Sequence, residues 1–184
     1  MGVVAALGAL AMPAGGLTGS ALGAGGSPVD PTLGLARLQG QFLLSGRVTA
    51  VRVRGERTGQ RVTRSWGFAS PCPVGPCPTL LLVRQRVIGG DSLALQQRGP
   101  GYYTGSGSFY VPLRCGGRTY PAGELVPFSI AVRVTKATRD ASGVLVASAI
   151  SARYTNRYRR NLTPCVAVTG HDAALYQGQL VTGG

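Results

Sequence analysis

The chain reads Trp66-Gly67-Phe68-Ala69-Ser70-Pro71-Cys72-Pro73-Val74-Gly75-Pro76-Cys77 in the stretch around which the rest of it is organised. This stretch joins a short aromatic strand to two cysteines that are separated by four residues. Three prolines fix the backbone φ angle and Gly75 permits a tight reversal, so we expect the segment to be rigid. Two thiols this close in sequence can close a small ring, and that ring, rather than a catalytic group, is the chemistry we expect here.

The composition around this stretch is that of a β-rich domain. The chain has 184 residues, long enough for one domain with a buried core, and 44% of them are hydrophobic. Its 29 glycines and 12 prolines are spread among the hydrophobic runs. This distribution argues against disorder and for many short strands joined by turns.

The charge balance is strongly basic. There are 19 basic residues against 6 acidic ones, for a formal net charge of +13, and Lys136 is the single lysine. A protein with this charge attracts polyanions and anionic surfaces.

The N-terminal segment indicates export. Residues 1–26 carry no charge, their first half has the apolar centre of a secretory signal, and Ala21-Leu22-Gly23-Ala24 is suited to cleavage. The basic region that normally precedes such a centre is missing, so we expect the true start to lie upstream; a flexible Gly/Ala-rich tail is the alternative. We therefore predict a signal-like segment over 1–26, a linker over 27–39 and one β domain over 40–184, secreted and not membrane-spanning.

Alternation of apolar and polar residues predicts about eight strands and almost no helix. The best pattern is at 125–137, where Phe128, Ile130, Val132 and Val134 share one face. The predicted strands cover residues 42–54, 62–68, 80–87, 92–98, 102–111, 125–137, 144–154 and 173–181. Hairpin-length turns join most of them, so we predict an all-β, antiparallel, up-and-down barrel of lipocalin type, because closure removes exposed edges. A β-sandwich is the alternative.

The order of these elements resembles a group of secreted actinobacterial proteins that share a Trp-x-Phe-x-x-x-Cys-x-x-Gly-x-Cys signature. The resemblance covers roughly residues 40–181. It implies export and β-structure, and it implies no reaction, because the group has no assigned activity. The matching residues are Trp66, Phe68, Cys72, Gly75, Cys77, Tyr103, Gly105, Cys115, Gly116 and Cys165.

Four cysteines in an exported chain predict two disulfides. Their spacing fits a metal site poorly, because zinc sites usually draw their ligands from Cys-x-x-Cys pairs. Of the three possible pairings, Cys72–Cys77 with Cys115–Cys165 is favoured, since the first pair closes within its own turn.

No constellation in the sequence favours an enzyme. His171 is the only histidine, and Asp172 beside it would point to the opposite face of a strand, so a catalytic triad is not predicted. No glycine-rich phosphate loop precedes a helix, and no cofactor is predicted. The six carboxylates are mostly predicted in turns, scattered rather than paired across a cleft: Asp30, Glu56, Asp91, Glu124, Asp140 and Asp172.

One basic run combines arginines with tyrosines in a pattern that suits phosphate pairing and stacking. A solvated connection between strands is the plainer interpretation of the same residues. In an exported protein the reachable polyanions are cell-envelope polymers, anionic lipid surfaces and extracellular DNA, and no specific nucleic acid is predicted. The candidate residues are Arg153, Arg157, Tyr158, Arg159 and Arg160.

These observations together predict an exported, disulfide-braced, non-enzymatic β domain that acts as an extracellular or cell-envelope binding or structural module. Two other classes stay open. A carrier of a small hydrophobic ligand needs an apolar lumen that side chains leave unfilled, and a hydrolase with an atypical site needs a nucleophile and a base within hydrogen-bond reach.

Overall fold

The structure is a computed structural model that describes residues 30–53, 55–85, 90–166 and 170–181. Within these residues the chain is all-β, with one short 3-10 helix. The elements are η1 (Pro31–Leu35), β1 (Gly40–Val51), β2 (Arg61–Ala69), β3 (Thr79–Gln85), β4 (Gly90–Gly99), β5 (Tyr102–Cys115), β6 (Arg118–Arg139), β7 (Leu145–Asn156), β8 (Arg160–Asn161) and β9 (Asp172–Leu180).

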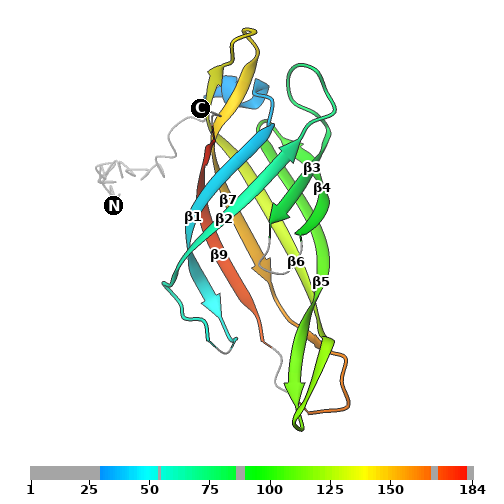
Figure 1. The fold of residues 1–184 in the computed structure, drawn as a ribbon. Helices are drawn as coiled ribbons and strands as arrows, with labels where there is room; N and C mark the ends of the chain where they lie inside the picture. Colours follow the sequence, from blue (N-terminus) through cyan, green and yellow to red (C-terminus); the bar gives the residue numbers. More distant parts are fainter. Residues whose placement is uncertain (1–29, 54, 86–89, 167–169, 182–184) are drawn as a thin grey trace, which may run out of the picture.

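Eight of the strands close into an antiparallel barrel (Figure 1). Strands β1 to β6 each pair with the next in sequence, and β9 pairs with both β7 and β1 to complete the ring. Strand β8 adds two residues to the outer part of β6. The predicted up-and-down barrel is therefore confirmed over the sandwich, with β8 as an additional short strand.

The core fills the half of the barrel next to η1. Alternate residues of each strand point inward, as a period of two requires, and the largest fully buried side chains include Phe42, Leu44, Leu82 and Tyr103. At the same end, Ala36 and Leu38 are buried behind η1. The described part of the predicted linker thus closes one end of the barrel.

The hairpin of β5 and β6 is longer than predicted. The sequence pattern placed a strand end at residue 111 and the next strand start at 125, whereas pairing continues to Cys115 and Arg118. Its register shifts between Val111 and Leu113, where Pro112 has no N–H to donate to the ladder. The outer part of this hairpin, which we call the arm (residues 107–125), projects beyond the barrel opposite η1 (Figure 1).

Two other predicted strands also end differently. The strand predicted over 42–54 stops at Val51, and Val53 lies in the connection to β2. The strand predicted over 80–87 is observed to Gln85, and its last two residues lie outside the described part of the chain.

Both predicted disulfides are confirmed. Cys72 and Cys77 are bonded with their Cα atoms 5.7 Å apart, within a turn in which Gly75 has a φ of 68°. Cys115 and Cys165 are bonded with their Cα atoms 6.3 Å apart, and this bond ties the tip of the arm to the connection between β8 and β9. All four cysteines are used, so none is left as a metal ligand.

Candidate functional site

A cavity of about 950 Å³ opens at the end of the barrel opposite η1. It lies where β1, β3 and β7 end and where β2, β4 and β9 begin, with the arm along one side. Its volume is in the range of pockets that hold small organic molecules. Most of its lining is apolar or aromatic and includes Val48, Val62, Trp66, Phe109, Tyr154 and Tyr176.

Strand β2 contributes both an aromatic floor and a cation. Alternation places Val62, Arg64 and Trp66 on its inner face, and all three line the cavity. Trp66 is buried, and its ring centroid lies 5.6 Å from that of Tyr176 on β9. The two rings form the floor, and Arg64 lies above it toward the mouth.

Gly46 lets Tyr176 occupy the interior. The two residues pair across β1 and β9. A Cβ atom at Gly46 would lie 2.2 Å from the Leu175 carbonyl oxygen and 2.6 Å from the Tyr176 ring. No side chain larger than hydrogen fits there, so the aromatic floor depends on this glycine.

Arg84 is a buried cation at the side of the cavity. Its Nε donates to Asp91 Oδ1 at 2.6 Å, and its Nη2 pairs with the other oxygen of the same carboxylate. Its guanidinium carbon lies 3.9 Å from the ring centroid of Phe128 and within 6 Å of those of Phe109 and Tyr154. The carboxylate and the ring faces together compensate for the hydration that this guanidinium loses.

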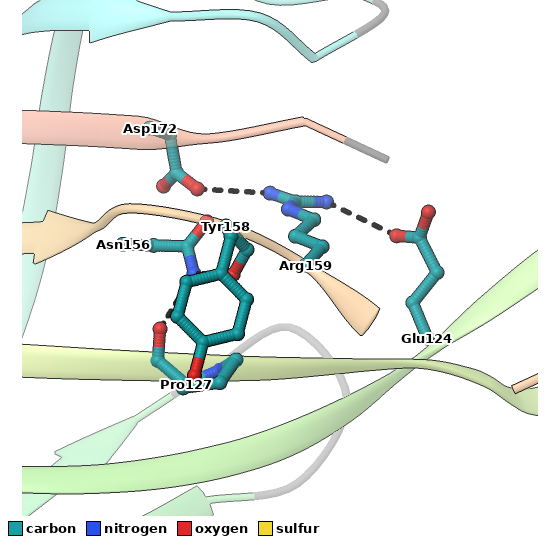
Figure 2. A network of polar contacts seen from close by, with 6 residues as sticks. All are labelled: Glu124, Pro127, Asn156, Tyr158, Arg159 and Asp172. Atoms are coloured by element: carbon teal, nitrogen blue, oxygen red, sulfur yellow. Dashed lines mark hydrogen bonds and ion pairs between the residues drawn. The ribbon is translucent and has the colours of Figure 1, made fainter. Parts of the chain in front are cut away.

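Arg159 holds a second ion network at the edge of the cavity (Figure 2). Its Nη2 donates to Asp172 Oδ1 at 3.0 Å, and its Nη1 lies 3.5 Å from Glu124 Oε2. Burial opposes the charge of Arg159, but its hydrogen bond to Asp172 and the charges of both carboxylates raise its pKa above the ordinary value. The guanidinium therefore stays charged and joins β9 to β6.

Asn156 sets the direction of the chain before Arg159. Its side-chain nitrogen donates to the carbonyl oxygens of Pro127 and Tyr158, and its side chain is buried (Figure 2). These two bonds hold the turn after β7 against β6. Tyr158 itself is 56% exposed, so the turn presents Tyr158 to solvent and Arg159 to the interior.

The electrostatics at Tyr176 show which charges surround the cavity floor. Burial raises the pKa of the Tyr176 hydroxyl, and the nearby cations of Arg64 and Arg84 lower it. Asp172 and Glu56 raise it further. Charges of both signs therefore lie within electrostatic range of the floor.

The carboxylates are less scattered than predicted. Glu56, Asp91 and Asp172 line the cavity, and Glu124 bonds to Arg159 beside it. The prediction that the acids lie mostly in turns is wrong for Asp91, Glu124 and Asp172, which lie in strands. Burial of arginine side chains in the lumen explains the difference, because buried cations require partners.

The predicted basic run is divided between two environments. Arg153, Arg157 and Arg160 are exposed, as is Tyr158, whereas Arg159 faces inward and is bonded to two carboxylates. A polyanion surface in this run thus depends on the three exposed arginines and Tyr158, and it stays a prediction.

Sequence reasoning missed Arg64 and Arg84. Each lies two residues from buried apolar side chains of its own strand, Arg64 from Trp66 and Arg84 from Leu82. An arginine that falls on the same face of a strand as the buried apolar residues, by the alternation of side chains, is the signal that could have identified them. In the described part of the chain no hydrogen bond or ion pair joins the side chains of His171 and Asp172, and the carbonyl of His171 accepts from the Arg52 backbone N–H.

Across the described part of the chain, no cluster of three or more metal-ligating side chains is present. No helix there has the length and hydrophobicity to cross a membrane. Comparison with known proteins found no matching family model, no matching curated protein and no matching solved structure, so the resemblance to secreted actinobacterial proteins stays a prediction.

Proposed function

We propose that this chain is an exported, non-enzymatic binding protein whose barrel holds a small ligand. The observation that carries the proposal is the cavity of about 950 Å³ with its aromatic floor. A structural barrel of eight strands fills its interior with side chains, whereas a carrier leaves room for one small ligand. The lumen here is filled at the η1 end and open at the other, which favours the carrier.

Export is the second part of the proposal. Two disulfides support it, because such bonds persist in oxidising compartments. The uncharged segment 1–26 supports it from the sequence, and that segment lies outside the described residues. N-terminal sequencing of protein recovered from the culture medium is expected to start between about Gly25 and Pro28, since a signal segment is cleaved after small residues; a start at Met1 would contradict export.

The neutral dye N-phenyl-1-naphthylamine tests whether the cavity is a binding site. We expect its fluorescence to rise on binding, with energy transfer from Trp66, the only tryptophan of the chain. Ala174 is buried and lines the cavity, so Ala174→Phe is expected to weaken dye binding by about tenfold or more, because it fills space that the dye requires.

The matched control is Gln177→Phe, which adds a ring to the outer face of the same strand and should leave dye binding unchanged. Thermal melts verify that both variants fold. Equal binding by the two variants, or dye fluorescence without transfer from Trp66, would show that the dye binds elsewhere. If Ala174→Phe does not fold, energy transfer from Trp66 to the dye in the unaltered protein decides whether the dye binds in the cavity.

A second candidate function, attachment to an anionic cell-envelope polymer, is favoured by a band of cations on the barrel exterior. Strand register places Arg61, Arg47 and Arg153 in one row across β2, β1, β9 and β7, with Leu175 between the last two. All three arginines are exposed, and neighbouring strands lie about 4.8 Å apart, so the row presents closely spaced cations.

Heparin serves as the probe for this band. A variant with Arg47, Arg61 and Arg153 changed to Gln is expected to elute from a heparin column at lower salt than a variant with three other exposed arginines changed to Gln. Both triple variants lose the same net charge, so their elution positions differ only if the band is a local binding site. Identical elution would exclude the band as a site. The control triple is Arg98, Arg114 and Arg118.

A further inference from the structure

We propose that the cavity selects a small amphipathic monoanion, whose apolar or ring-bearing body rests on Trp66 and Tyr176 and whose single carboxylate or sulfonate group pairs with Arg64. The inference rests on the proposed function, because it names the class of ligand for the same cavity.

The first step of the argument is the charge state of the cavity arginines. Arg84 is already paired with Asp91, and Arg159 with two carboxylates. Arg64 differs, because its side chain donates a hydrogen bond from Nη1 to the carbonyl oxygen of Thr63, its own neighbour, at 2.8 Å. All six carboxylate side chains of the chain lie within the described residues, and none of them forms an ion pair with Arg64.

The second step is the position of Arg64 relative to the floor. Arg64 and Trp66 are two residues apart on the inner face of β2, so their Cα atoms lie about 7 Å apart along the strand. Trp66 is buried at the bottom, whereas Arg64 is exposed within the open part of the cavity. A ligand with its rings over the floor would present an anionic group near the guanidinium.

The third step limits the ligand to one negative charge. Glu56 and Asp172 also line the cavity, so two carboxylates lie in the same space as Arg64. A second anionic group on the ligand would meet one of these carboxylates. A single anion can face Arg64 and avoid both.

The test uses two dyes with the same ring system. 8-Anilinonaphthalene-1-sulfonate carries one sulfonate, and N-phenyl-1-naphthylamine lacks it. Arg64→Gln is expected to weaken binding of the sulfonate dye by about tenfold, the usual effect of losing a hydrogen-bonded charge pair, and to change binding of the neutral dye by less than about twofold. Arg64→Lys keeps the charge and should retain most of the affinity for the sulfonate dye.

The control variant is Arg98→Gln, which removes the same charge from the outer face of β4. The inference is overturned if Arg64→Gln and Arg98→Gln weaken the sulfonate dye equally, since net charge alone would then explain the effect. It is also overturned if both dyes lose affinity equally in Arg64→Gln. A different result would contradict the proposed function itself: neither dye receives energy from Trp66 in the unaltered protein.

Discussion

Arg159→Met is expected to lower the free energy of unfolding by about 3 kcal/mol, the usual cost of removing one partner from a buried ion network. The side chains of Arg159, Glu124 and Asp172 are 13%, 10% and 17% exposed, so solvent screens their interaction little. Methionine fills most of the volume but leaves two carboxylates without a cation. Urea unfolding at neutral pH measures the loss.

The pH dependence separates this electrostatic effect from a packing defect. In Arg159→Met the two carboxylates can shed their uncompensated charge by taking up protons. The loss of stability is therefore expected to be largest near pH 7 and to shrink toward about pH 4, where carboxylates begin to protonate. A loss that is the same at both pH values would contradict the network.

Arg157→Met is the matched control, because Arg157 belongs to the same basic run and is exposed. Its unfolding free energy is expected to change by less than about 0.5 kcal/mol. A similar loss in both variants would mean that the run stabilises the fold through its charge in general and not through the pairing of Arg159.

The two disulfides are expected to differ in their contribution to stability. The bond between Cys115 and Cys165 spans 50 residues and that between Cys72 and Cys77 spans five. The chain-entropy model assigns about 4 kcal/mol to the long loop and about 2 kcal/mol to the short one. Cys115→Ser/Cys165→Ser should therefore lower the melting temperature more than Cys72→Ser/Cys77→Ser.

Changing both cysteines of each pair avoids a free thiol, so the comparison concerns the cross-links alone. Thermal unfolding followed by circular dichroism measures both variants at one pH. Equal losses, or a larger loss for the short ring, would mean that constraint of the unfolded chain does not dominate these bonds.

Much of the barrel could be predicted because its strands alternate in a simple way. The hairpin of β6 and β7 shows this best, since Phe128, Ile130, Val132 and Val134 are all buried as the pattern required. The arm could not be predicted, because residues 118–124 contain proline and glycine, and their two buried residues, Gly123 and Glu124, are adjacent and do not alternate with exposed ones. Its pairing depends on the partner strand and on the disulfide at its tip.

The candidate site was harder to predict for a physical reason. Basic residues are normally solvated, so an arginine in a strand is interpreted as part of the outer face. Arg84 and Arg159 are inside because carboxylates of other strands pair with them: Asp91 of β4 with Arg84, and Glu124 of β6, 35 residues away in sequence, with Arg159. The pairs of Arg159 become visible only when β6, β9 and the connection after β7 are brought together.

The position of β9 has a consequence for how the protein reaches its final state. Strand β9 pairs with two strands at once, with β1 at the start of the domain and with β7. During synthesis from the N-terminus, the seven strands β1 to β7 therefore have two unpaired edges until the chain has been extended to residue 180. During that interval the edges of β1 and β7 can pair with other chains. Addition of the last strand, rather than formation of the first hairpins, is thus the step that closes the barrel.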